Sequence, residues 1–107
     1  MNKVTARGPY VAAYIISDVK VRDAAAIEIY RTRAAASIAK YGGQYLVRGG
    51  NVEVLEGGWA PRAIIIVEFP DMERARAWYH SPEYSLALDV RDEALNRNLI
   101  LVEGHTP

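Results

Sequence analysis

The segment from Ala77 to Tyr84, with the sequence AWYHSPEY, gathers several side chains that can take part in chemistry. His80 can act as a general base near neutral pH, and the hydroxyl of Tyr84 can orient it through a hydrogen bond. We therefore predict His80 and Tyr84 as the catalytic residues of an acid–base site. The alternative is that His80 is a partly exposed histidine in a turn between two helices.

Thiol chemistry is excluded, because the sequence contains no cysteine. Thiolate nucleophiles, disulfides and zinc–sulfur sites are therefore ruled out. His80 is not accompanied by His, Asp or Glu at a ligand spacing, whereas a metal site needs three or four convergent ligands. We expect no metal and no cofactor. A role for His80 as a haem ligand is the alternative that the sequence leaves open.

Three further residues are candidates for binding a small molecule. Trp78 offers an apolar wall with a polar tip, which suits a flat ligand. Arg48 precedes Gly49 and Gly50, where the backbone permits close approach of a carboxylate or phosphate. Arg62 stands at the start of a strand, at an end of the sheet where an anion could bind. The alternative for Trp78 is that its ring only packs in the core. The alternative for Arg48 and Arg62 is that their side chains are solvated and bind no ligand.

The elements that position these residues follow from the apolar pattern. Apolar runs predict strands over residues 10–19, 62–69 and 97–104. A helix begins after the N-cap residue Asp23 and ends at the glycine pair 42–43. Its apolar stripe consists of Ile27, Tyr30, Ala34, Ile38 and Tyr41.

Two short helices follow the strand over residues 62–69. Asp71 caps the first, over about residues 72–80, and Ser81-Pro82 starts the second, which runs to about Ala94. A residue before proline avoids helical backbone angles, so Ser81 should end one helix and begin the next. The AWYHSPEY segment is therefore predicted to be a helix break.

Residues 44–62 contain two glycine pairs and permit two arrangements. A hairpin around Gly49-Gly50-Asn51 would give the next strand the wrong direction for a β-α-β-β-α-β order. We therefore predict one long strand, kinked by a bulge at Gly49-Gly50, and a tight turn over residues 57–61.

This order of elements predicts an α+β fold, a ferredoxin-like sandwich (β-α-β-β-α-α-β) with an antiparallel sheet. The 107 residues suffice for a single domain over residues 1–107. With a period of two, the side chains predicted to face the helices are Val11, Ala13, Ile15, Ala63, Ile65, Val67, Phe69, Ile100 and Val102. The same alternation places Asp18 between Arg62 and Arg97 on the opposite face, if the first strand lies between the third and the fourth.

The opposite face is also apolar, and this predicts self-association. Its large side chains are Tyr14, Ile16, Ile64, Ile66, Leu99 and Leu101. Leaving each of them exposed forgoes about 1.5–3 kcal/mol of burial free energy. We therefore predict a homodimer formed through the sheet face, a dimeric α+β barrel.

Composition excludes two classes of partner. Thirteen basic and thirteen acidic residues balance, without a basic stripe, so we expect no nucleic acid. No apolar run approaches the roughly 18–20 residues that span a bilayer, so we expect no membrane insertion. The early apolar run from Val11 to Ile16 is short for a signal peptide, which predicts a cytoplasmic protein.

Several motifs together resemble the bacterial family called domain of unknown function 1330. They are KYGGQYLVRGG, VEVLEGGWAPR, IIVEFPDMERARAWYHSPEY and LILVEG, between about Tyr10 and Gly104. The resemblance implies a ferredoxin-like dimeric α+β barrel and supplies no activity. More distantly similar barrels include cofactor-independent monooxygenases, lactone isomerases and haem-binding enzymes, but none of their catalytic motifs is identifiable here. The aspartate-proline helix start associated with the family is replaced by Asp23-Ala24.

The sequence thus predicts a cytoplasmic homodimer with a pocket for a small, anionic or neutral, organic molecule. If the protein is an enzyme, we expect cofactor-independent acid–base or oxygen chemistry. The alternative is a non-catalytic dimerisation or ligand-binding module in which the same side chains only pack.

Overall fold

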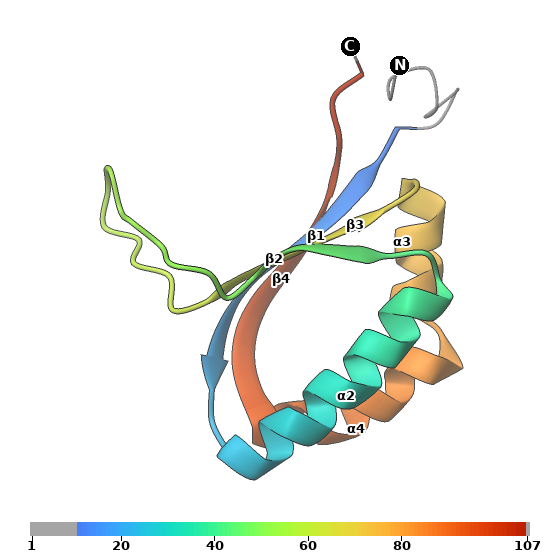
Figure 1. Cartoon of the computed structure of the whole chain (residues 1–107), viewed down its shortest axis with the longest axis horizontal. Helices are drawn as coiled ribbons and strands as arrows, with labels where there is room; N and C mark the ends of the chain where they lie inside the picture. The colour runs from blue at the N-terminus through green and yellow to red at the C-terminus, as the bar shows by residue number, and fades with distance from the viewer. Residues whose placement is uncertain (1–10, 107) are drawn as a thin grey trace.

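The computed structural model describes residues 11–106, which form one sheet with three helices on one of its faces (Figure 1). The strands are β1 (Ala13–Val21), β2 (Gln44–Arg48), β3 (Ile64–Phe69) and β4 (Leu95–Glu103). The helices are α2 (Ala24–Lys40), α3 (Met72–Tyr79) and α4 (Pro82–Ala94). The order of elements is the predicted β-α-β-β-α-α-β, and the α+β fold class is confirmed.

The sheet has the strand order β2-β3-β1-β4, and neighbouring strands are antiparallel. The first strand therefore lies between the third and the fourth, as predicted. Ile15 pairs with Val67 on one side and with Leu101 on the other. Because directly paired residues point to the same face, this register decides which side chains meet the helices.

Local capping explains where the helices begin and end. The Asp23 carboxylate accepts from the Ala26 N–H at 2.7 Å, and Asp71 caps α3 in the same way. Ser81 separates α3 from α4: its hydroxyl accepts from the Tyr84 N–H at 3.0 Å and donates to the Trp78 carbonyl at 2.7 Å. The predicted helix break in AWYHSPEY is therefore confirmed, with one serine bonded to both helices.

The long kinked strand predicted to precede the turn over residues 57–61 is wrong. The irregularity in β2 lies between Tyr45 and Val47, and the strand ends at Arg48. Residues 49–63 form no strand, and Figure 1 shows most of this segment, which we call the arm (residues 50–62), extending away from the sheet. Pairing of β2 with β3 ends at Arg48, and the Gly49 N–H adds one further bond to the Ile64 carbonyl, so the arm begins where the ladder stops.

The face predicted for the last strand is also wrong. Leu99 pairs with Ser17 and Leu101 with Ile15, so both leucines face the helices. Ile100 and Val102 lie on the open face and are 54% and 41% exposed. The run LILV is apolar at every position, so alternation alone could not choose its face. For the first and third strands the predicted faces agree with the register.

The core lies between the sheet and the helices. It contains the apolar stripe of α2, the inner residues of β1 and β3, and a group of aromatic rings. The Trp78 ring packs against Phe69 at 5.4 Å and against Tyr84 at 4.2 Å between centroids. These ring contacts hold α3 against β3 and α4 against α3.

Candidate functional site

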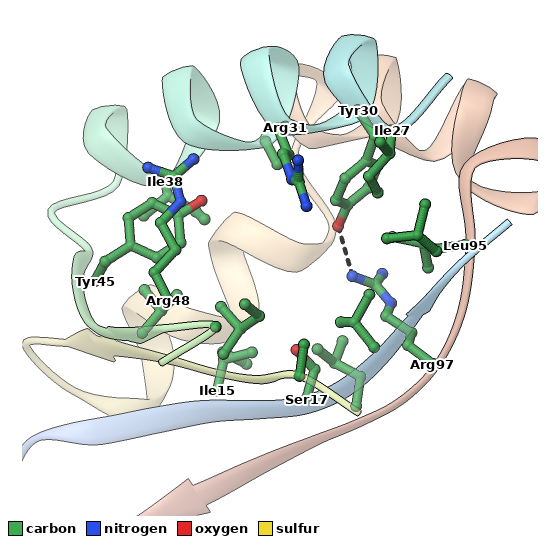
Figure 2. Close-up of a pocket in the computed structure, with 18 of the residues that line it drawn as sticks. Ile15, Ser17, Ile27, Tyr30, Arg31, Ile38, Tyr45, Arg48, Leu95 and Arg97 are labelled. Carbon is green, nitrogen blue, oxygen red and sulfur yellow. Dashed lines mark hydrogen bonds between the residues drawn. The ribbon is translucent and has the colours of Figure 1, made fainter. Parts of the chain in front are cut away.

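A cavity of about 310 Å³ lies between α2 and the inner face of the sheet (Figure 2). Its walls are mostly aliphatic, with polar groups at a few places. The residues that line it are Ile15, Ser17, Val19, Val21, Ile27, Tyr30, Arg31, Ala34, Ile38, Tyr45, Arg48, Gly49, Ala63, Ile65, Val67, Trp78, Leu95, Arg97 and Leu99. A concave, mostly apolar space with a few convergent polar groups is typical of a small-molecule site.

The spacing of side chains along a helix and along a strand explains which of them reach the cavity. On α2, Ile27, Tyr30, Ala34 and Ile38 follow the three- and four-residue spacing of one helix face. On β1, alternate residues point inward, and Ser17 is small where its neighbours are large. The apolar stripe of the helix was predicted as core, and part of it forms the roof of the cavity.

Two tyrosines and an arginine form a polar centre in one wall. The hydroxyl oxygens of Tyr30 and Tyr84 lie 2.5 Å apart. Arg97 donates from Nη1 to the Tyr30 hydroxyl at 2.5 Å and from Nη2 to the Tyr84 hydroxyl at 2.6 Å. Figure 2 shows Arg97 reaching from β4 toward Tyr30, which hangs from α2. We call these three residues the Tyr–Tyr–Arg cluster.

The hydrogen bonds within this cluster leave one O–H group unused. Tyr84 has no exposed surface, and within residues 11–106 the Tyr30 oxygen is its one acceptor. The Tyr84 O–H therefore donates to Tyr30, while both hydroxyl oxygens accept from Arg97. The O–H of Tyr30, a residue that lines the cavity, is then left without an acceptor inside the cluster.

Burial raises the pKa of Tyr30 well above its ordinary value, and the neighbouring Tyr84 adds to the effect. The Tyr30 hydroxyl therefore stays protonated at neutral pH and can donate a hydrogen bond to a ligand. A guanidinium keeps its proton throughout, so the cluster carries one positive charge.

Two other arginines lie at the cavity. Arg48 stacks over the Tyr45 ring at 4.2 Å, and Figure 2 shows this pair on the other side of the cavity from Arg97. Arg31 lies on the helix and pairs with Glu28 at 2.7 Å. Among residues 11–106, those that line the cavity include three arginines and no aspartate or glutamate. The lining is therefore electrically positive.

Two of the predicted binding residues line this cavity. Arg48 is one, with its exposed side chain at the rim. Trp78 is the other, although it is only 2% exposed and its indole N–H donates to the Ser37 hydroxyl at 2.9 Å. Trp78 thus both packs in the core and contributes to the cavity wall.

The predicted pairing of His80 with Tyr84 does not form. His80 is exposed at the C-terminal end of α3, outside the cavity lining, and its ring contacts Tyr79 at 5.3 Å between centroids. The Tyr84 hydroxyl points instead toward Tyr30 and Arg97. The helix break turns the two side chains in different directions, because Ser81 and Pro82 start a new helix between them.

The predicted grouping of Arg62 and Arg97 around Asp18 is wrong for Arg97. The Asp18 carboxylate accepts from the Arg62 backbone N–H at 3.0 Å and from the Trp59 indole N–H at 3.0 Å. Arg62 lies outside the cavity lining. Arg97 lies on the inner face instead, because the register of β4 is shifted by one residue from the predicted one.

Sequence reasoning missed Tyr30 and Arg97 as site residues. Tyr30 was identified only as part of the apolar stripe of the helix. Arg97 carried a signal, since it follows buried Leu95 by two residues and therefore shares its face. The approach of Tyr30 to Tyr84, which are 54 positions apart, had no signal in the sequence.

Two features that would point to a function are absent from residues 11–106. This part of the chain contains no group of three or more His, Asp or Glu side chains that could hold a metal ion. None of its helices is long and apolar enough to cross a membrane.

The fold and the cavity together define the class of this protein: a ferredoxin-like α+β domain with a mostly apolar cavity between helix and sheet. The chain belongs to the family described as domain of unknown function DUF1330, whose model matches residues 12–105. The family resemblance of the sequence motifs is thereby confirmed. No curated protein matches the chain.

Solved structures share the fold at low sequence identity. A protein of unknown function from Rhodopseudomonas palustris has a TM-score of 0.74 and 19% identity, over 98% of this chain and 91% of that one. SnoaB, a cofactor-independent oxygenase from Streptomyces nogalater, has a TM-score of 0.64 and 15% identity. The match covers 91% of this chain and 96% of SnoaB. A dimeric ferredoxin-like protein of unknown function from Bacteroides fragilis has a TM-score of 0.56 and 16% identity. The match covers 88% of this chain and 99% of that one.

Proposed function

We propose that this protein is a homodimer in which each chain binds a small organic molecule in the cavity between α2 and the sheet. The observation that carries this proposal is the cavity of about 310 Å³, lined mainly by aliphatic side chains and by a few polar groups. An engineered cavity of about 150 Å³ in another protein holds benzene, so this one has room for a molecule larger than a single ring. Arg48 and Trp78 are the predicted residues that would contact it.

The homodimer is supported by the apolar character of the open sheet face and of the arm. Ile100 and Val102 are exposed on this face, beside Ile16 of β1, which pairs with Ile100. The arm adds Leu55 and Trp59, which are 83% and 65% exposed. A second copy packed on the sheet would cover these side chains about a two-fold axis. The similar protein from Bacteroides fragilis is described as dimeric, which supports a homodimer for this chain.

A cofactor-independent enzyme is the form of this function that the Tyr–Tyr–Arg cluster favours. A neutral Tyr30 O–H beside the Arg97 guanidinium can stabilise negative charge that develops on a substrate oxygen. The likeness to SnoaB is an analogy of fold and not of residues. In this proposal Tyr30 replaces His80 as the group that meets the substrate, and Tyr84 holds Tyr30 in place. The alternative remains a ligand-binding module without catalysis, and we retain the cytoplasm as the proposed location.

Native mass spectrometry of the protein purified from cells tests the dimer and the ligand together. We expect a dimer that carries an additional small mass, which is lost when the protein is denatured. Ala63 lines the cavity, so Ala63→Phe should remain dimeric and lose the additional mass. Ala36→Phe, at an exposed position of α2, is the matched control and should keep it. A monomer would contradict the dimer, and retention of the mass by Ala63→Phe would contradict the proposed site.

A further inference from the structure

We propose that the ligand of this cavity is a mainly apolar monocarboxylate, whose carboxylate is bound by Tyr30 and Arg97. This inference rests on the proposed function and specifies the chemical class of the ligand. It depends on three observations: the charge of the cavity lining, the hydrogen-bond donors that remain free, and the apolar character of the walls.

Within residues 11–106, no carboxylate bonds to Arg97 and compensates its charge. Arg31 is paired with Glu28, and its side chain is half exposed, so it needs no further partner. Arg97 is partly buried, and within residues 11–106 its hydrogen bonds go to two phenolic hydroxyls and to no carboxylate. Neutral hydroxyls satisfy N–H groups but supply no negative charge. A partly buried cation without an anion is costly, and a bound carboxylate would compensate it.

The free donors are suitably placed for a carboxylate. Arg97 has five N–H groups, of which two bind the tyrosine hydroxyls. The Tyr30 O–H has no acceptor inside the cluster, and Tyr30 lines the cavity. One carboxylate oxygen can therefore accept from Tyr30 and the other from a remaining N–H of Arg97. Figure 2 shows both groups at the same wall of the cavity.

Apart from Arg48, which is exposed at the rim, the rest of the lining suits a ligand with one negative charge and an apolar body. Beyond the cluster the walls are formed by side chains such as Ile15, Ile27 and Leu99. A phosphate would bring up to two negative charges, of which the single positive charge of the cluster offsets one. A carboxylate attached to a ring or a branched chain matches both the polar wall and the apolar ones.

The test compares two probes of nearly the same shape, 2-naphthoate and its neutral amide, by isothermal titration calorimetry. We expect the wild-type protein to bind 2-naphthoate about tenfold or more tightly than the amide, since charged hydrogen bonds contribute about 1.5–3 kcal/mol. Inorganic phosphate should not compete with 2-naphthoate. This comparison uses only the wild-type protein, so it does not depend on whether a variant folds.

Variants then locate the carboxylate. Arg97→Gln should weaken 2-naphthoate binding about tenfold or more and leave amide binding within about twofold. Tyr30→Phe keeps the ring and should weaken 2-naphthoate binding about threefold to tenfold. Arg31→Gln removes the same charge from the same cavity, but Arg31 already has its partner, so it should change binding by about twofold or less.

The possible failures are distinguishable. Equal binding of 2-naphthoate and the amide to the wild-type protein would overturn the carboxylate inference and leave the small-molecule site standing. Equal losses in Arg97→Gln and Arg31→Gln would overturn the assignment of the carboxylate to the cluster. Binding of neither probe, even at millimolar concentration, would count against the proposed small-molecule site itself.

Discussion

Tyr84 belongs to the core and to the polar centre of the cavity at once. Its ring is enclosed by Trp78 and by Tyr30, whose ring lies edge-on at 6.4 Å. Its hydroxyl fixes the position of the Tyr30 hydroxyl, although Tyr84 itself is not among the cavity-lining residues. We therefore treat Tyr84 as a positioning residue, and its ring and hydroxyl should contribute to stability in different amounts.

Substitution of Tyr84 separates these two contributions. Tyr84→Ala should lower the free energy of unfolding by about 3–5 kcal/mol, because a fully buried aromatic ring is lost. Tyr84→Phe should lower it by about 1–2 kcal/mol, because Arg97 and Tyr30 lose a hydrogen-bond partner. Urea unfolding followed by circular dichroism measures both values.

The matched control is Tyr79→Phe, since Tyr79 is partly exposed and no hydrogen bond of its hydroxyl is found within residues 11–106. It should change the free energy of unfolding by about 0.5 kcal/mol or less. A loss below about 1 kcal/mol in Tyr84→Ala would show that this ring contributes little to the core.

At the scale of elements, Ser81 determines how α3 and α4 present their aromatic residues. It is buried, and its hydroxyl bonds to the last turn of one helix and the first turn of the next. Trp78 and Tyr84 therefore reach the same core from two helices, while His80 turns toward solvent. The segment predicted to carry the catalytic residues forms the junction of two helices, and one of its aromatic residues, Trp78, lines the cavity.

Removal of the Ser81 hydroxyl should destabilise this junction. We expect Ser81→Ala to lower the free energy of unfolding by about 1–2 kcal/mol, the usual cost of a lost N-cap. Ser85→Ala is the control: its hydroxyl donates to the Pro82 carbonyl in the same helix, but at an exposed position. The control should cost about 0.5 kcal/mol or less, and equal costs in thermal or urea unfolding would contradict the junction role.

At the scale of the whole molecule, the sheet separates two surfaces with different roles. The inner face and the helices enclose the cavity, whereas the open face carries apolar side chains that nothing within residues 11–106 covers. The arm extends beyond the sheet edge in Figure 1 and adds further exposed apolar surface. In the proposed dimer these two features would be buried together.

A charge placed on the open face should weaken this dimer. Ile100→Glu would bury an unpaired carboxylate at the interface, and we expect the dimer dissociation constant to rise about tenfold or more. Leu86→Glu is the control, because Leu86 is 55% exposed, close to the 54% of Ile100, but lies on α4. Analytical ultracentrifugation over a concentration series measures both. An unchanged dissociation constant in Ile100→Glu would place any dimer interface elsewhere.

The sequence by itself determined the three helices and three of the four strands, because their signals are local. Asp23, Asp71 and Ser81 are caps that act within one helical turn, and the apolar runs of β1 and β3 have clear lengths and boundaries. The family motifs and the strand order were also recognisable from the sequence. These features need no information about distant parts of the chain.

The tertiary structure alone decided the register of β4, the course of the arm and the composition of the site. A strand that is apolar at four consecutive positions can present either set of alternate side chains to the helices. The register of β4 with β1 decides which set faces inward, and this register brings Arg97 to the cavity. Likewise Tyr30 and Tyr84 meet only because α2 and α4 pack on the same face of the sheet. Long-range packing is not encoded in local periodicity, and for this reason the polar centre could not be found by spacing alone.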